Sequence, residues 1–253
     1  MTKLKSQIAS LLRSNSLFIA LSLILVVVLG LALLYIPKGE LHLLLCDRHT
    51  PARDIFYRYY TQAAEWFPYA VCILILLFGR VGDGVFGISC LALSGLTTQV
   101  LKYAADTARP YSWFAENMPD ITLPLVEGVH LSKYYSFPSG HTTSFFALTF
   151  FLCILATTRL SSKTSLSSSS SLSSSSSLSS SSRLSSLFSI AIQFLLFCLA
   201  ALGGYSRIYL SQHFTEDVAG GILVGLIITL LCYVLFYRFE DQKWYNYRIF
   251  AKK

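Results

Sequence analysis

Charged residues are scarce in this sequence of 253 residues, where Asp, Glu, Lys and Arg together make up 13%. That share is about half of what an average soluble domain carries. Hydrophobic residues make up 54% of the chain, and the mean hydropathy is +0.57. These values exclude a disordered tail, a collagen-like rod and an ordinary soluble enzyme. They leave an integral membrane protein, which we expect to form one domain over residues 1–253.

Cysteine patterns of metal sites and disulfide frameworks are also missing. None of the six cysteines occurs as CxxC or at Cys/His ligand spacing. Five of them lie in apolar stretches and are interpreted as small packing residues: Cys72, Cys90, Cys153, Cys198 and Cys232. The net charge of +7 does not require nucleic acid, because basic residues also mark the cytoplasmic side of membrane proteins. We expect no nucleic-acid partner.

Six apolar stretches are candidates for transmembrane helices, each of which needs about 20 residues. They are residues 17–36, 67–79, 84–101, 142–158, 187–205 and 218–237. The first has no small-residue cleavage site after it and predicts an uncleaved span. The second is short, and we expect it to extend back toward Tyr59. The predicted fold is therefore an all-α bundle of about six transmembrane helices.

Residues 38–65, between the first two spans, are rich in charge and aromatic side chains. They indicate either an amphipathic helix at the membrane interface or a plain loop. With six spans, both termini lie on one side of the membrane. That side carries twelve of the 20 Lys and Arg residues and the other side eight. The bias predicts cytoplasmic termini.

Residues 161–186 are almost entirely serine, with a leucine at every sixth position from Leu166 to Leu184. Six residues turn an α-helix by about 600°, so these leucines do not share a helical face. We interpret the tract as a flexible cytoplasmic linker between the fourth and fifth spans and assign it no function.

Three polar clusters interrupt the apolar chain. Lys102 and Arg109 close the third span, Pro138-Ser139-Gly140-His141 opens the fourth, and the segment from Ser206 to Asp217 joins the fifth to the sixth. Each could be an ordinary helix end. In the six-span topology, however, all three fall on the same side of the membrane. Ionisable groups at membrane depth are costly and usually functional.

The clusters together suit cleavage of a phosphate ester. Lys102 and Arg109 are seven residues apart, about two helical turns, and we expect them to share a helix face. With Arg207 they supply three cations for one phosphate. Ser139 and Gly140 begin a helix, whose free N–H groups favour an anion. These five residues are the predicted phosphate ligands.

Two histidines supply the predicted chemistry. His213 and Asp217 are four residues apart, so a helical turn would bring the carboxylate against the imidazole. An aspartate on one ring nitrogen leaves the other free to attack. His141 remains to exchange protons with the leaving group. His42, His49 and His130 fit no such pattern and are interpreted as plain polar loop residues.

The three clusters read KxxxxxxRP, PSGH and SRxxxxxHxxxD, from Lys102 to Asp217. They resemble the signature motifs of the type 2 phosphatidic acid phosphatase family, which includes the vanadium haloperoxidases. One departure is a long gap between His141 and Ser206, which the serine tract explains. The resemblance implies that His213 forms a phosphohistidine, Asp217 orients it, and His141 protonates the leaving oxygen and then activates water. It implies no metal and no cofactor.

The resemblance implies a bacterial inner-membrane lipid phosphatase with its site facing the periplasm. Its substrate would be a phosphorylated membrane lipid. We favour lipid A phosphate by analogy, and the alternatives are undecaprenyl diphosphate, phosphatidylglycerol phosphate and phosphatidic acid. A vanadium haloperoxidase is disfavoured by the six spans. A non-catalytic lipid-binding protein is disfavoured because no motif residue is missing.

Overall fold

The computed structural model describes residues 2–46, 49–170 and 175–250, and this part of the chain is helical without strands. The predicted all-α class is confirmed. The α-helices are α1 (Thr2–Ser14), α2 (Ser16–Tyr35), α3 (Lys38–Cys46), α4 (Pro51–Gln62), α5 (Phe67–Phe78), α6 (Val81–Ala105), α7 (Pro110–Asn117), α8 (Gly140–Ser170), α9 (Ser175–Tyr209), α10 (Thr215–Phe236) and α11 (Lys243–Asn246).

Five stretches are long and apolar enough to cross a membrane, and they contain α2, α6, α8, α9 and α10. A bent pair, α4 and α5, meets at 46° and supplies a sixth span if the two cross together. Large apolar side chains such as Val27, Leu96 and Leu231 are exposed on the outer faces of these helices. Lipid is the solvent that such faces require. The chain is an integral membrane protein.

The segment before α5 differs from its prediction. Residues 38–65 form neither one interfacial helix nor a plain loop, since they contain α3 and α4 as separate helices. α4 begins at Pro51 and is the first helix of the bent pair. The second helix, α5, has Pro68 in its first turn. Proline lacks an N–H and clashes with the preceding turn, which explains why the helix breaks here. The expected extension of the second span toward Tyr59 agrees with this bent pair.

The serine tract also differs from its prediction. α8 continues to Ser170 and α9 begins at Ser175, so the described part of the tract extends the two spans as helices. Residues 171–174 lie outside the described residues. Serine has moderate helix propensity, and a helix already formed in an apolar span adds further turns at little cost.

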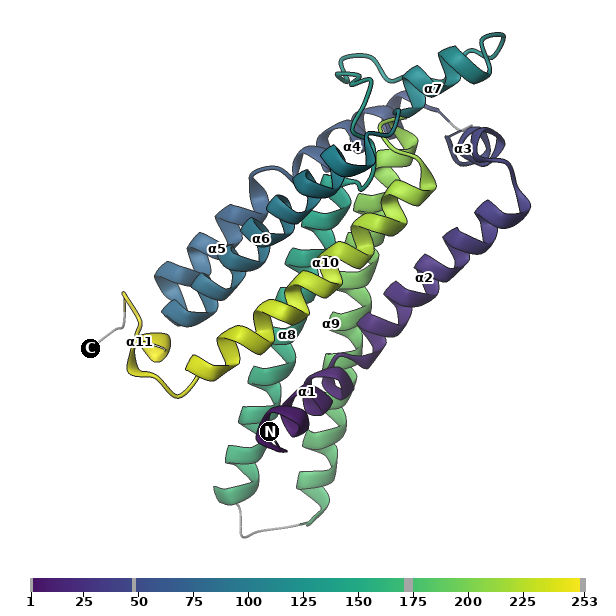
Figure 1. The fold of residues 1–253 in the computed structure, drawn as a ribbon. Helices are drawn as coiled ribbons and strands as arrows, with labels where there is room; N and C mark the ends of the chain where they lie inside the picture. The colour runs from purple at the N-terminus through teal and green to yellow at the C-terminus, as the bar shows by residue number, and fades with distance from the viewer. Residues whose placement is uncertain (1, 47–48, 171–174, 251–253) are drawn as a thin grey trace.

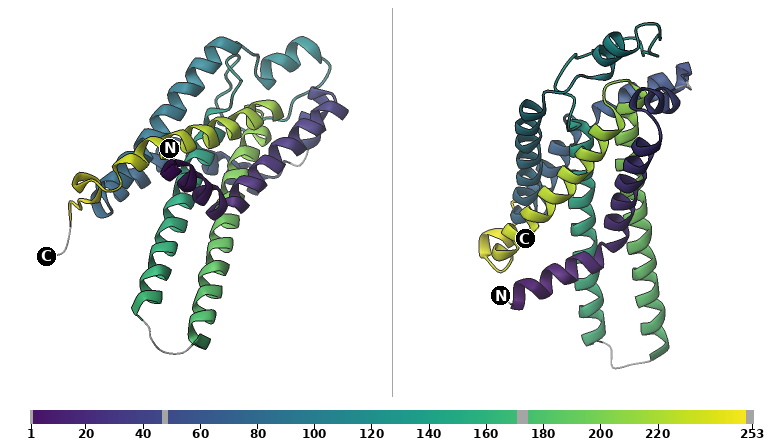
Figure 2. Two further views of the ribbon diagram at one scale, coloured as in Figure 1. Left: turned by 60° about the horizontal axis from the view of Figure 1, so that its bottom comes forward. Right: turned by 45° about the vertical axis from the view of Figure 1, so that its right-hand side comes forward.

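The helices run between two ends of the bundle, and α8 lies near its centre against α6, α9 and α10 (Figure 1). α3, α4 and α7 lie at one end, whereas α1 and α11 lie at the other (Figures 1 and 2). α6 and α9 end where α8 and α10 begin. This alternation brings four helix ends together beside α7.

Glycines let α10 approach the start of α8 closely. A Cβ on Gly221 would lie 2.7 Å from the backbone oxygen of Ser139, and one on Gly225 would lie 2.9 Å from that of Thr143. Contacts this short leave no room for a side chain. The two helices that carry the second and third polar clusters are therefore held against each other.

Candidate active site

The three polar clusters border one cavity of about 540 Å³ at the α7 end of the bundle. Six of the eight predicted site residues line it: Lys102, Arg109, Gly140, His141, Arg207 and His213. Ser139 and Asp217 lie directly behind this wall, and the backbone N–H of Ser139 donates to the Asp217 carbonyl at 2.9 Å. The structure thus brings all eight residues into one region.

His213 lies in the loop between α9 and α10, and Asp217 lies in the first turn of α10. The His213 Nδ1 is 3.4 Å from the Asp217 Oδ2, and both side chains are only 2% exposed. The contact spans four residues, as expected, although His213 precedes the helix. Because Nδ1 faces the carboxylate, Nε2 is the nitrogen left for chemistry.

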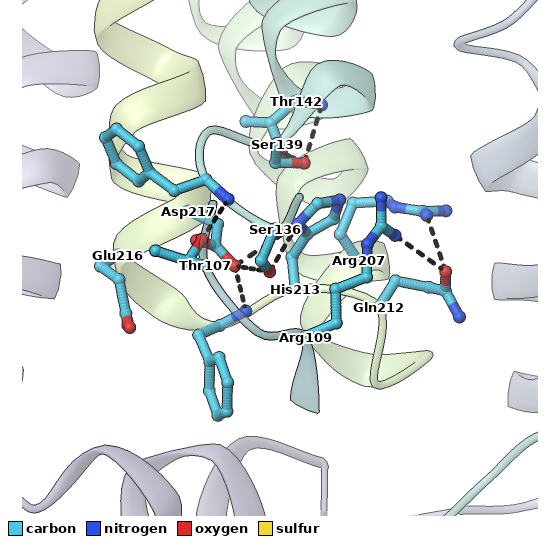
Figure 3. Close-up of polar contacts among 12 residues, drawn as sticks. Thr107, Arg109, Ser136, Ser139, Thr142, Arg207, Gln212, His213, Glu216 and Asp217 are labelled. Atoms are coloured by element: carbon cyan, nitrogen blue, oxygen red, sulfur yellow. Dashed lines mark hydrogen bonds and ion pairs between the residues drawn. The ribbon is translucent and has the colours of Figure 1, made fainter. Parts of the chain in front are cut away.

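Ser136 completes this pair, and the sequence analysis did not identify it (Figure 3). Its hydroxyl donates to the Asp217 Oδ2 at 2.5 Å and lies 3.4 Å from the His213 Nδ1. The backbone N–H of Phe214 donates to the same carboxylate oxygen at 2.8 Å. Two groups besides His213 therefore fix the Asp217 side chain, which in turn orients the imidazole.

The two cations of the first cluster do not share a helix face, which corrects the expectation from their spacing. α6 ends at Ala105, and Asp106 adopts the left-handed conformation, with φ of 39°. Arg109 is the N-cap residue of the separate helix α7. Lys102 Nζ donates to the Tyr135 carbonyl at 2.5 Å, while Arg109 Nε donates to the Tyr134 carbonyl at 3.1 Å. The loop before α8 therefore positions both cations.

Arg207 is the most enclosed of the three cations, at 6% exposed. Its Nη1 donates to the Thr61 hydroxyl at 2.6 Å, and its Nη2 lies 3.5 Å from the Gln212 Oε1. Its Nε is buried and has no partner within the described part of the chain. A buried donor without a partner is costly, so this N–H suits an anion in the cavity.

Within the PSGH motif, Ser139 has different surroundings from Gly140 and His141. The Ser139 hydroxyl faces the first turn of α8, where it accepts from the Thr142 hydroxyl at 2.9 Å and from its N–H at 3.4 Å (Figure 3). That side chain acts as a helix cap, and its predicted role as a phosphate ligand stays a prediction. Gly140 and His141 line the cavity at the N-terminus of α8, where backbone N–H groups favour an anion.

His141 has a carboxylate neighbour that the sequence analysis missed. Its Nε2 lies 3.2 Å from the Glu65 Oε1, at the break between α4 and α5. Glu65 is 62% exposed at its side chain, so its charge is partly screened. The contact places a carboxylate beside the imidazole that is predicted to exchange protons with the leaving group.

Electrostatics set the protonation state of His213. Burial lowers the pKa of its imidazole well below the usual 6.5, and the charges of Arg109, Arg207 and Lys102 lower it further. The ring is therefore neutral at pH 7 and keeps a lone pair on Nε2. A neutral imidazole surrounded by cations is suited to attack an anionic ester that those cations bind.

Residues outside the motifs complete the cavity wall. Arg58, Thr61 and Glu65 come from the α4 region, and His130 from the loop between α7 and α8. They carry no spacing signal in the sequence, because the contacts depend on where α4 lies.

His130 and His42 were expected to be plain loop residues. His130 lines the cavity, whereas His42 is a fully buried residue of α3 whose Nε2 lies 3.2 Å from the Ser211 hydroxyl.

His49, which was also expected to be a plain loop residue, is not among the residues that line the cavity. Its Nδ1 lies 2.9 Å from the Asp54 Oδ1, and its ring stacks on Tyr209.

Within the described residues, no group of three or more His, Cys, Asp or Glu side chains is arranged to hold a metal ion. The positive charge of the cavity comes from Lys and Arg side chains.

Comparison with known proteins gives consistent results. The sequence model of the PAP2 superfamily matches residues 84–241. A probable lipid phosphate phosphatase 4 of Arabidopsis thaliana is 27% identical over 171 residues, which cover 62% of this chain and 49% of that protein. The chain thus spans about half the length of this curated relative.

Two solved structures share the fold. The crystal structure of Aquifex aeolicus LpxE has a TM-score of 0.50 at 23% identity, covering 76% of this chain and 92% of that one. The crystal structure of a transmembrane PAP2 type phosphatidylglycerolphosphate phosphatase from Bacillus subtilis has a TM-score of 0.53 at 20% identity. That match covers 92% of this chain and 100% of the other. At these identities the likeness concerns the fold.

Proposed function

This chain belongs to the PAP2 superfamily, and we propose from its cavity that it is a membrane lipid phosphatase that works through a phosphohistidine. The observation that carries the proposal is the convergence of three distant motifs on one cavity. There a neutral imidazole, whose Nδ1 faces a fixed carboxylate, stands among three cations. Neither a structural role nor simple lipid binding requires that combination.

In the proposed reaction, Lys102, Arg109 and Arg207 bind the phosphoryl oxygens together with the N–H groups at the start of α8. His213 Nε2 attacks phosphorus, a P–N bond forms, and the P–O bond to the lipid breaks. His141 protonates the departing oxygen. It then takes a proton from water, which attacks the phosphohistidine and releases inorganic phosphate. Asp217 stabilises the positive charge on the imidazole during the attack.

The reaction needs no metal in this proposal, because the three cations already neutralise the charge that builds on the phosphoryl oxygens. No cofactor takes part. We expect activity to persist in EDTA. Vanadate should inhibit, since it mimics five-coordinate phosphorus. If activity were lost in EDTA and restored by added divalent ions, the proposed metal independence would be contradicted.

The substrate is proposed to be a lipid whose headgroup sits at the membrane interface. A second cavity of about 350 Å³ shares Lys102 and Arg109 with the first and is lined by Tyr103, Tyr134 and Tyr135. These tyrosines are 71%, 50% and 43% exposed. Exposed aromatic side chains beside a cationic site are typical of the interface. Lipid A phosphate is the leading candidate by analogy, and undecaprenyl diphosphate, phosphatidylglycerol phosphate and phosphatidic acid are the alternatives.

The test is phosphate release from a panel of these lipids by the purified protein in detergent. We expect His213→Ala to lose at least about 1,000-fold in kcat, because no other group can form the intermediate. His49→Ala serves as the control, since His49 lies outside the cavity wall. Unchanged activity in His213→Ala would refute the assigned nucleophile, and no turnover of any lipid phosphate by the wild type would refute the function.

The proposed phosphohistidine can be detected with a substrate whose leaving group needs no protonation. An aryl phosphate leaves without protonation, so His141→Asn should still form the phosphohistidine but hydrolyse it slowly. We expect a burst of aryl alcohol equal to the enzyme concentration, together with acid-labile phosphate on His213. A steady rate without a burst, and without labelled protein, would argue against a covalent intermediate.

A further inference from the structure

A fourth cation lines the cavity and belongs to none of the three motifs. Arg58 lines the cavity from α4, together with Lys102, Arg109 and Arg207. Its Nη1 donates to the backbone carbonyl of Glu127 at 3.1 Å. Its Nε is buried without a partner within the described residues. The guanidinium group thus keeps donors that the protein itself does not use.

The loop between α7 and α8 is shaped to accept this side chain. Gly128 has φ of 75°, and a Cβ at this position would lie 2.6 Å from the Arg58 Nη1. Glycine therefore lets the guanidinium lie against the loop backbone while it borders the cavity. No carboxylate ion pair to Arg58 is present in the described part of the chain, so its charge is not neutralised by the protein.

The net positive charge of the side chains that line the cavity exceeds the negative charge of one phosphate group. Four cationic side chains line it, and Glu65 is the single carboxylate among the lining residues. Three positive charges remain. A phosphate monoester carries about −1.5 to −2 at pH 7, so one such group leaves about one cation without a counter-charge. A cavity of about 540 Å³ also exceeds what a single phosphoryl group fills, because it is within the range of sites for larger ligands.

We propose that Arg58 binds a second anionic group of the substrate, next to the phosphoryl group that His213 attacks, and that the preferred substrates are lipid diphosphates. The inference rests on the proposed function and selects among its substrates. His213 forms a bond to the terminal phosphorus, and the P–O bond of the bridging oxygen breaks. The electron pair stays on the inner phosphate, where Arg58 stabilises the added charge. Water then releases inorganic phosphate, and the lipid monophosphate leaves.

The test compares farnesyl diphosphate with farnesyl phosphate, which share one chain and differ by one phosphate. We expect the wild type to favour the diphosphate in kcat/KM. Arg58→Gln should lower kcat/KM for the diphosphate by about 30-fold, the scale of a charge-assisted hydrogen bond, and for the monophosphate by less than about threefold. Arg58→Lys keeps the charge and should recover part of the loss.

Arg53→Gln provides the matched control, because Arg53 lies on the same helix and is not among the cavity-lining residues. Equal losses on both substrates in Arg58→Gln would overturn the proposal and leave Arg58 as a support for the loop. The melting temperature of each variant separates that case from unfolding. A wild type that hydrolyses the monophosphate equally well would also overturn it. Hydrolysis of neither substrate, nor of any other lipid phosphate, would instead defeat the proposed function.

Discussion

Gln212 lies between two of the arginines that line the cavity, Arg109 and Arg207. Its Oε1 is 3.4 Å from the Arg109 Nη1 and 3.5 Å from the Arg207 Nη2, as Figure 3 shows. Its Nε2 is buried and has no partner within the described residues, so the guanidinium groups are the polar groups that orient the amide. A neutral acceptor holds two like charges together without cancelling them. A carboxylate at this position would cancel part of the charge that the substrate needs.

Gln212→Glu should therefore weaken anion binding without disturbing packing, since the two side chains have nearly the same shape. We expect the inhibition constants of phosphate and vanadate to rise by at least about tenfold. Arg109 and Arg207 help to lower the pKa of His213, so a carboxylate between them should raise it. The fraction of neutral His213 then falls at low pH. The acidic limb of the kcat/KM profile should shift to higher pH.

Gln62→Glu is the control for this change, because Gln62 lines the same cavity and no hydrogen bond joins its side chain to an arginine within the described residues. Its pH profile should move less than that of Gln212→Glu. A wild-type pH profile and wild-type phosphate inhibition in Gln212→Glu would show that Gln212 only fills space.

At the scale of elements, the contact between α8 and α10 determines the distance between the two histidines. His141 lies in the first turn of α8, whereas His213 precedes α10 and Asp217 lies in its first turn. The backbone N–H of Ser139 already donates to the carbonyl of Asp217, which links the two helix starts. A side chain between the helices would separate the proposed proton donor from the nucleophile.

Gly221→Ala places a Cβ 2.7 Å from the Ser139 backbone oxygen, which cannot move without shifting the start of α8. We expect a loss of stability of about 1–3 kcal/mol and at least about a tenfold fall in kcat. Thermal unfolding in detergent and lipid phosphatase assays measure the two effects.

Gly30→Ala on α2 is the matched control, since no atom lies within 4 Å of the added Cβ. It should leave both melting temperature and activity unchanged. Equal behaviour of the two variants would mean that the helices tolerate a wider spacing, and that the glycine contact does not set the active-site geometry.

At the scale of the whole molecule, the bundle has two chemically different ends. α7 lies at one end, and α1 and α11 lie at the other (Figure 1). The proposed active-site cavity is lined by Arg109, the N-cap residue of α7. The excess of Lys and Arg on the terminal side predicts that this end faces the cytoplasm. The cavity would then face the periplasm, where it meets lipids of the outer leaflet of the inner membrane.

Cysteine labelling in intact cells tests this orientation. Glu116 and Lys243 are exposed residues at opposite ends of the bundle, on α7 and α11. In a Cys198→Ser background, which removes the one exposed cysteine of the chain, a membrane-impermeant maleimide should label Glu116→Cys directly. Lys243→Cys should react only after the cells are permeabilised. The reverse pattern would place the active site in the cytoplasm.

Local properties of the sequence were enough to predict much of this protein. Hydropathy depends on a single stretch of chain, so the apolar spans and the helical class could be identified without a structure. Motif spacing likewise identified His141, His213 and Asp217 as neighbours of three cations. Local rules failed where the backbone departed from a regular helix. Lys102 and Arg109 do not share a helix face because the left-handed Asp106 ends α6 between them.

Only the tertiary structure decided which other side chains reach the site. Thr61 contacts Arg207 across 146 residues of sequence, and Glu65 meets His141 across 76. Arg58 lines the same cavity because α4 packs against α9, and no spacing within the sequence encodes that contact. Such contacts depend on how whole helices pack, which is a sum over many weak interactions rather than a property of neighbouring residues. For that reason the groups proposed to be catalytic could be identified from the sequence, whereas the residues proposed to position them and to select the substrate could not.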